Sequence, residues 1–300
     1  MNVRTRKQAL TEGVTAGILF GTAAIFVRFL PDLSAFAIAF WRLVIGFLAL
    51  AAVSFFLRKP FHGNRVQENL KDLFILSVLL GFHFIFFTLA VKDTTILNAT
   101  VLVNMTPIFS MLMSIFIFKV RPSRFAVAGL LASFIGICLI AYGETITSAD
   151  ASKIVSPSPV GDLEAILAAL LIAFYLSYGK KVRKQMTVLS SMVPIYAFAA
   201  IIVGVFSVPT RSTVLAFSIT PDKILPLIGL GLLPTTIAHT LYFSSLSNLR
   251  SFETATMAFL EPVGATMLGI TVFHEVPSLI FVLGAALVLT GIFFIIRNRS

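Results

Sequence analysis

Residues 103–140 read VNMTPIFSMLMSIFIFKVRPSRFAVAGLLASFIGICLI, and residues 258–295 read AFLEPVGATMLGITVFHEVPSLIFVLGAALVLTGIFFI. The second stretch lies 155 positions after the first, and four glycine and proline positions agree without a gap over thirty residues. The agreeing pairs are Pro107 with Pro262, Pro122 with Pro277, Gly129 with Gly284, and Gly136 with Gly291. Such regular agreement indicates that the chain contains two copies of one unit.

Both copies are strongly apolar, and so is the rest of the chain. Of the 300 residues, 58% are hydrophobic and 12% are charged, and the mean hydropathy is +0.98. A soluble domain carries about twice that share of charged residues. A bilayer, rather than an aqueous core, accounts for this composition and for the 30 phenylalanines.

Ten segments are long and apolar enough to span a bilayer, which requires about 20 mostly apolar residues. They are 11–30, 34–57, 72–91, 95–118, 124–142, 162–179, 187–208, 224–247, 252–273 and 278–296. Each must be α-helical, because lipid offers no partner for backbone N–H and C=O groups. The runs are too long and unbroken for barrel strands. The first run is too long for a signal peptide, so we expect it to be retained.

The distribution of lysine and arginine predicts the orientation. With the N-terminus inside, four basic residues fall in the outer segments, namely Lys92, Lys153, Arg211 and Lys223. Seventeen fall in the inner segments, namely Arg4, Arg6, Lys7, Arg58, Lys59, Arg65, Lys71, Lys119, Arg121, Arg124, Lys180, Lys181, Arg183, Lys184, Arg250, Arg297 and Arg299. We therefore predict a multi-pass protein of the cell membrane (plasma or inner membrane) with both termini in the cytoplasm.

The predicted domain organisation follows from the duplication. Residues 1–143 form a first repeat of five helices, residues 144–160 form an extracytoplasmic linker, and residues 161–300 form a second repeat of five helices. Because five is odd, the second copy enters the membrane from the opposite side, which gives an inverted-topology repeat. Two inverted copies can exchange conformations, so that a cavity opens to one side and then to the other, as a carrier requires.

Several functions are disfavoured by what the sequence lacks. The net charge of +10 follows membrane topology, so we expect no nucleic-acid partner. The single cysteine, Cys138, excludes an intrachain disulfide and a thiolate cluster. No Walker-type phosphate loop, HExxH or GxSxG motif is present, which argues against ATP-driven transport and the common membrane hydrolases. We expect no cofactor, no metal site and no enzymatic activity.

The most informative polar residue is Glu261, which lies about 15 Å from the inner edge of the predicted ninth helix. A carboxylate at this depth is costly unless it is paired, protonated or hydrated. Glu261 is therefore a candidate to bind a cationic group, or to take up a proton and couple transport to the proton gradient. The alternative is a neutral glutamic acid that hydrogen-bonds to a neighbouring helix.

Three other ionisable residues fall at membrane depth. Arg42, in the second helix, lies at a depth close to that of Glu261, so it either pairs with this carboxylate or has a structural role, snorkelling or capping carbonyls. His83 and His239, in the third and eighth helices, are candidates to line a cavity and titrate, or else they are packing residues. Neither histidine has a further ligand at helical spacing, so we do not predict a metal site.

Two prolines interrupt the backbone hydrogen bonds of their helices. Pro107 and Pro262 each free a carbonyl one turn back, near Val103 and Ala258. Such a carbonyl can bind substrate or let the helix flex, whereas the alternative for both prolines is a packing kink.

Smaller side chains complete the set of candidates. Asn104, Thr106 and Tyr175 are expected either to line a cavity or to form interhelical hydrogen bonds. A glycine stripe on one face of the first helix predicts close helix packing; it consists of Gly13, Gly17 and Gly21.

The duplicated ten-helix pattern resembles the drug/metabolite transporter superfamily, in its EamA-type branch. The mid-helix prolines carry this resemblance, in Asn104-Met105-Thr106-Pro107 and Phe259-Leu260-Glu261-Pro262. So do Glu275, near the end of the ninth helix, and the glycine-containing tenth helix. The likeness covers nearly the whole chain, although Val120 stands where Glu275 has its counterpart in the first repeat.

The resemblance implies a secondary transporter that moves small metabolites, such as amino acids or amphiphilic drugs, by alternating access. We expect an exporter, monomeric or homodimeric, in which Glu261 and His83 are the gating or coupling residues. One alternative within the superfamily is an exchanger of nucleotide-sugars or phosphorylated metabolites, which needs basic groups in its cavity. From another class, a membrane-embedded lipid-modifying enzyme would gather acids, histidines or serines at one interface. A non-transporting subunit has no need of an inverted repeat.

Overall fold

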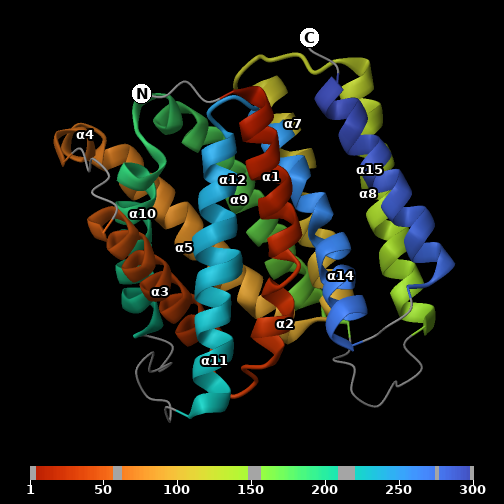
Figure 1. Cartoon of the computed structure of the whole chain (residues 1–300), viewed down its shortest axis with the longest axis horizontal. Coiled ribbons are helices and arrows are strands. Elements are labelled where there is room, and N and C mark those ends of the chain that lie inside the picture. Colours follow the sequence, from red (N-terminus) through yellow and green to blue (C-terminus); the bar gives the residue numbers. More distant parts are fainter. Residues whose placement is uncertain (1–4, 57–62, 148–156, 209–219, 274–276, 298–300) are drawn as a thin grey trace.

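The computed structural model describes residues 5–56, 63–147, 157–208, 220–273 and 277–297, and the regular structure within these ranges is entirely helical (Figure 1). In these ranges, nine helical segments are long and apolar enough to cross a membrane. They are Arg6–Arg28, Ala35–Phe56, Leu70–Asp93, Ile96–Phe116, Arg124–Gly143, Pro159–Gln185, Val188–Ser207, Pro221–Ser245 and Leu279–Arg297. The predicted all-helical membrane fold is confirmed.

The described residues of the first half contain eight helices. They are α1 (Arg6–Phe20), α2 (Ala23–Arg28), α3 (Ala35–Phe56), α4 (Gly63–Glu68), α5 (Leu70–Asp93), α6 (Ile96–Val103), α7 (Thr106–Phe116) and α8 (Arg124–Thr147). Two pairs of these, α1 with α2 and α6 with α7, each form one span. The break between α6 and α7 precedes Pro107, which has no N–H with which to continue the helix. The hydroxyl of Thr106 donates to the freed carbonyl of Val103 at 2.7 Å.

The second half is interrupted more often. It contains α9 (Pro159–Gln185), α10 (Val188–Ser207), α11 (Pro221–Leu230), the π-helix η2 (Gly231–His239), α12 (Thr240–Ser245), α13 (Ser251–Ala255), the 3-10 helix η3 (Thr256–Leu260), α14 (Glu261–Phe273) and α15 (Leu279–Arg297).

The tenth predicted span, 252–273, is not among the nine, and in the structure it consists of α13, η3 and α14. Pro262 accounts for the change of helix type, since it cannot donate to the carbonyl of Ala258. The N–H of Glu261 bonds to the Ala258 carbonyl instead, which is the tighter pattern of a 3-10 turn. Glu275 and most of the predicted linker lie outside the described residues.

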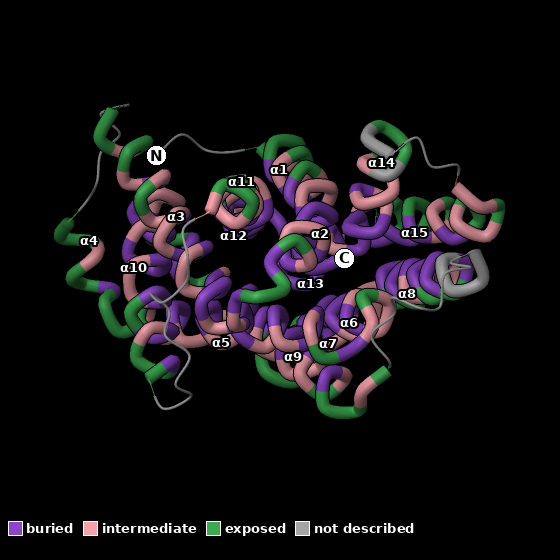
Figure 2. The backbone as a smooth tube through the Cα atoms, turned by 90° about the horizontal axis from the view of Figure 1, so that it is seen from below, coloured by how far each residue is buried: buried purple, intermediate pink, exposed green. Residues whose placement is uncertain are grey.

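The helices stand in two rows when they are viewed along their axes (Figure 2). One row contains α12, α1 and α14, and the other contains α5, α9 and α7. At one end of the rows α3 packs on α10, and at the other end α8 packs on α15. The inner faces are buried and carry most of the apolar core, so the space between the rows is where the polar residues of the spans must find partners.

Glycine brings α1 and the turn after it into backbone contact with η3 and α14. A Cβ atom on Gly17 would overlap the carbonyl oxygen of Met257 in η3, and one on Gly264 in α14 would overlap the carbonyl oxygen of Ile18. A Cβ on Gly21 would meet the backbone of Glu261 at 2.6 Å. The helix that carries Glu261 therefore lies directly against α1.

Glycine also brings α8 against α15. A Cβ on Gly129 would lie 2.5 Å from the carbonyl oxygen of Gly291, and one on Gly136 would lie 2.6 Å from that of Gly284. Between these two contacts, the hydroxyl of Ser133 donates to the carbonyl of Val288 at 3.1 Å. The pairing of ascending with descending residue numbers shows that the two helices are antiparallel.

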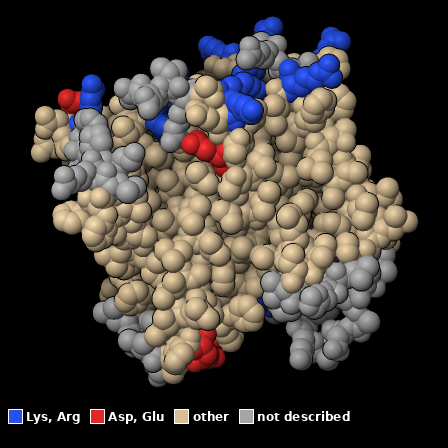
Figure 3. All heavy atoms as spheres, viewed as in Figure 1, with Lys and Arg blue, Asp and Glu red and all other residues tan. Residues whose placement is uncertain are grey.

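The start of α1 and the end of α15 lie at the same end of the molecule (Figure 1). The Arg6 side chain lies 2.8 Å from Glu253 and donates to the carbonyl of Ile296 at 2.9 Å. At the same end, Lys180 donates to the carbonyls of Leu246 and Leu249, each at 2.6 Å. Lysine and arginine gather around this end on the face seen in Figure 3.

We expect Gly17→Ala to destabilise the protein, because the added methyl group forces α1 away from the main chain of η3. Overpacking of this kind costs about 1–3 kcal/mol. The measurement is the midpoint of thermal unfolding in detergent. Gly63→Ala is the control, since a Cβ there meets nothing within 4 Å. Equal midpoints for the two variants would contradict the close contact.

Candidate functional site

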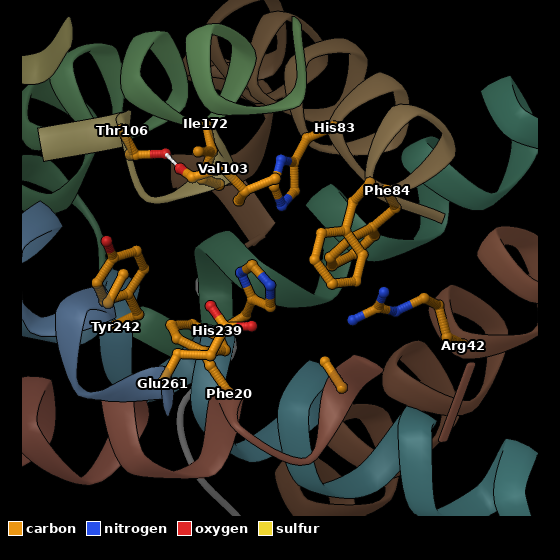
Figure 4. A pocket seen from close by; sticks show the side chains of 13 residues that line it. Phe20, Arg42, His83, Phe84, Val103, Thr106, Ile172, His239, Tyr242 and Glu261 are labelled. Atoms are coloured by element: carbon orange, nitrogen blue, oxygen red, sulfur yellow. Dashed lines mark hydrogen bonds between the residues drawn. The ribbon is translucent and has the colours of Figure 1, made fainter. Parts of the chain in front are cut away.

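A buried cavity lies between the two rows of helices, and several of the predicted residues meet there (Figure 4). It contains about 490 Å³ of space not filled by atoms, counted out to its open side. It is lined by Phe20, Ala23, Arg42, His83, Phe84, Phe87, Val103, Thr106, Ile172, His239, Tyr242, Ala258 and Glu261.

Both copies of the duplicated unit contribute equivalent residues to this cavity. Eight of the thirteen lining residues form pairs separated by 155 positions, which is the offset of the repeat. The pairs are Phe84 with His239, Phe87 with Tyr242, Val103 with Ala258, and Thr106 with Glu261. The cavity therefore lies where the two copies face each other.

Arg42 occupies one end of the cavity. Its side chain is 1% exposed, its Nε donates to the Thr235 hydroxyl at 2.8 Å, and its guanidinium lies 3.9 Å from the centre of the Phe84 ring. This is the geometry of a cation–π contact. One terminal guanidinium nitrogen, Nη1, is buried without an acceptor among the described residues. A buried donor left in this way is costly, so this end of the cavity suits an anionic group.

The π-helix η2 holds the partner of Arg42 in place. Pro234 cannot donate to the carbonyl of Leu230, and the π-helical pattern directs the N–H of Thr235 to it instead. The hydroxyl of Thr235 also donates to this carbonyl, at 2.7 Å. The carbonyl of Thr235 in turn accepts from the Tyr196 hydroxyl at 2.6 Å. Because its own proton is committed to Leu230, the Thr235 hydroxyl presents a lone pair to Arg42. A π-turn of this kind often marks a functional site.

Glu261 occupies the opposite end of the cavity (Figure 4). It begins α14 and is 8% exposed. Asn104, another predicted residue, does not line this cavity, and its amide donates to the carbonyl of Thr100 at 2.9 Å. No ion pair within 4 Å joins Glu261 to Arg42, although both side chains line one space. The cavity therefore has a cationic end and an acidic end.

Two histidines lie between these ends. The Nδ1 of His83 is 2.9 Å from the Ala168 carbonyl, and because a carbonyl only accepts, Nδ1 is the donor. The ring centres of His83 and His239 are 6.0 Å apart. The His239 ring meets Phe20 and Phe84 edge-on, each at 4.8 Å between centres. The His239 ring is therefore bordered by Phe20 and Phe84.

Of the remaining predicted residues, only some line this cavity. Thr106 lines it, Pro107 lies next to it at the start of α7, and Pro262 faces a second space behind Glu261. Tyr175 is fully buried elsewhere, and its hydroxyl donates to the sulfur of Met192 at 3.3 Å. Within the described part of the chain, no group of three His, Cys, Asp or Glu residues could hold a metal.

Sequence reasoning did not single out the aromatic wall, which consists of Phe20, Phe84, Phe87 and Tyr242. With 30 phenylalanines in the chain, composition gives no reason to choose these. The repeat offset does contain a signal, because Phe84 and Phe87 are the counterparts of His239 and Tyr242. Thr235, which accepts a hydrogen bond from Arg42, is the residue after Pro234, and Thr106 is the residue before Pro107.

Known proteins share this sequence pattern and fold. The profile of the EamA-like transporter family matches residues 9–142 and 159–297. The chain belongs to this family. An uncharacterized transporter of Archaeoglobus fulgidus is 26% identical over 292 residues, which cover 95% of this chain and 94% of that protein. The uncharacterized transporter YoaV of Bacillus subtilis is 25% identical, with 84% of each chain covered.

The fold also occurs in a protein of known crystal structure. The two chains superpose with a TM-score of 0.78 and 17% sequence identity, over 97% of this chain and 96% of the other. The chain is thus a multi-pass membrane transporter with two EamA repeats. The predicted family is confirmed, and the cavity described above is the place to look for its substrate.

We expect Thr235→Val to destabilise the protein more than Thr236→Val. Each valine removes a hydroxyl that bonds to the carbonyl five residues earlier, but only the first also leaves Nε of Arg42 unpaired. That extra loss is about 1–3 kcal/mol. Thermal unfolding of the two variants measures it, and an equal effect of both would show that Thr235 does not support Arg42.

Proposed function

We propose that this protein is a secondary carrier, and an exporter, of small zwitterionic metabolites with an apolar side chain, of which hydrophobic amino acids are the type. One observation carries the proposal. A buried arginine with an unused donor and a buried carboxyl group occupy opposite ends of one cavity with aromatic walls. A carboxylate at Arg42, an ammonium group at Glu261 and a side chain against Phe20, Phe84 and Phe87 would fill it.

The energetics favour such a ligand. Removing one charge from water is costly unless an opposite charge and hydrogen bonds compensate for it. A zwitterion supplies both compensating charges at once, because its carboxylate accepts from the guanidinium and its ammonium group donates to Glu261. Nucleotide-sugars and phosphorylated metabolites fit less well. Among the described lining residues Arg42 is the only permanent cation, and a phosphate needs more than one.

Transport would proceed by alternating access between two inverted repeats of five spans. In this scheme α13, η3 and α14 together form the ninth of ten spans, and the repeats are related by a twofold axis in the membrane plane. The contacts of α8 with α15 support this. The offset of 155 converts the contact of Gly136 with Gly284 into that of Gly291 with Gly129, and it converts Ser133 into its own partner, Val288.

Further helix contacts support the same axis. The packing of α5 on α9 has its counterpart in η2 and α12 on α1, and that of α3 on η2 has its counterpart in α10 on α5. The start of α1 and the end of α15 lie on one face, as ten spans require. The basic residues on that face favour a cytoplasmic location for it.

Proton coupling follows from Glu261. A proton and a substrate ammonium group compete for this carboxyl group, so one is released as the other binds. Competition of this kind yields antiport, in which an inward proton gradient drives outward transport of substrate. His83 and His239 lie between Glu261 and Arg42 and would complete the set of groups that share protons in the cavity.

A series of related ligands tests the charge requirement. We expect phenylalanine to raise the unfolding temperature of the wild-type protein, and phenethylamine and 3-phenylpropionate to raise it less. Arg42→Gln should no longer prefer phenylalanine to phenethylamine, which lacks the carboxylate. Glu261→Gln should no longer prefer phenylalanine to 3-phenylpropionate, which lacks the ammonium group. Each lost charged hydrogen bond corresponds to about 10–100-fold in affinity. Equal responses to all three ligands in the wild type would refute the zwitterion site.

Proteoliposomes test the coupling. Wild-type protein should acidify or alkalise the lumen in response to a phenylalanine gradient, as a pH-sensitive dye inside the vesicles reports. Glu261→Gln should abolish this signal, because an amide cannot exchange protons. Glu253→Gln, which alters a buried glutamate at the end that carries the termini, is the control. If Glu261→Gln retained the proton signal, coupling would have to reside elsewhere.

A further inference from the structure

Glu261 belongs to the lining of a second cavity, which lies behind the first one. This cavity contains about 540 Å³ of space not filled by atoms, again counted out to its open side. It is lined by Gly21, Ala24, Ile25, Ile96, Leu97, Thr100, Val101, Ile137, Ile140, Ala141, Glu261, Pro262 and Ala265. These residues come from α2, α6, α8 and α14 together with the turn after α1.

The chemistry of the second cavity differs from that of the first. Of the described residues that line it, only Glu261 is ionisable, and Thr100 is the only other one with a polar side chain. It has no counterpart of Arg42, so a ligand carboxylate would find no cationic partner there. Its walls are aliphatic rather than aromatic, so they suit a hydrocarbon chain.

Two features keep this space open. Small residues line it at Gly21, Ala24, Ala141 and Ala265. In addition, α8 and α15 contact each other through glycines far more extensively than they contact the other helices, and Figure 1 shows this pair at one edge of the molecule.

The same cavity reaches the outer surface of the bundle. Ile96, which lines it, is 38% exposed and is the first residue of α6. A hydrocarbon chain can therefore enter the cavity at this end of the span.

We propose that the second cavity binds the hydrocarbon tail of a single-chain amphipathic cation whose ammonium group is held by Glu261. This inference rests on the proposed function only in that Glu261 serves as the ammonium site. Because one carboxyl group serves both cavities, the amphipathic cation and a zwitterionic metabolite exclude each other. The carrier thus accepts two shapes of ligand that share one positive group.

Alkyltrimethylammonium ions of increasing chain length are the probes. In nanodiscs, we expect the affinity of the wild-type protein to rise by up to about fourfold per methylene group until the cavity is full. Ala141→Phe should remove this dependence on chain length by filling the cavity, and Ala265→Leu should shorten the longest chain accepted. Ala128→Phe is the matched control, since Ala128 is an exposed alanine of the same helix, α8, and partitioning of the probes into the bilayer is the same for both.

The outcomes separate the two proposals. Phenylalanine binding that survives in Ala141→Phe shows that the variant is folded, and loss of chain-length dependence in that variant alone supports the second cavity. The same dependence in Ala141→Phe and Ala128→Phe, or tetradecyltrimethylammonium binding that is unchanged in Glu261→Gln, overturns it while leaving the zwitterion site intact. Conversely, if phenylalanine fails to bind but the alkyl series depends on Glu261 and Ala141, the proposed function fails and the tail site stands.

Discussion

A backbone carbonyl in hydrocarbon must have a hydrogen-bond partner, and this constraint shapes the centre of the molecule. Three prolines each remove the amide that would serve a carbonyl one turn back. The carbonyls of Val103, Leu230 and Ala258 are then satisfied by the Thr106 hydroxyl, the N–H and hydroxyl of Thr235, and the Glu261 N–H. Each replacement donor is the immediate sequence neighbour of its proline.

The three residues that supply these replacement hydrogen bonds lie in or next to the candidate site. Thr106 and Glu261 line the central cavity, and Thr235 supports Arg42. A local departure from α-helical geometry turns a side chain or a main-chain group toward the space between the two rows of helices. The irregularity that removes one main-chain hydrogen bond from the helix therefore also gives the cavity its polar groups. Close glycine contacts hold η3 and α14 against α1.

Much of this arrangement could be predicted from sequence because the signals are local. Hydropathy gives the spans, proline gives the breaks at Pro107 and Pro262, and depth along the helix places Glu261 and Arg42 near each other in height. Rotation about a helix axis is harder to predict, so the sequence leaves open whether Tyr175 lines the cavity or bonds to a neighbouring helix. In the structure its hydroxyl donates to Met192 in α10. The bond from Arg42 to Thr235 joins residues 193 positions apart. It also depends on the π-helix η2, which the pattern of apolar residues does not predict.

The equivalence of positions across the cavity has an evolutionary consequence. Thr106 and Glu261 occupy the same place in the two copies, and Arg42 corresponds to Ala197. Two identical subunits assembled around the same centre would bring two carboxylates or none, and two guanidinium groups or none. Joining the copies in one polypeptide lets each half mutate independently, and a binding space whose two ends differ in charge becomes accessible only after that fusion.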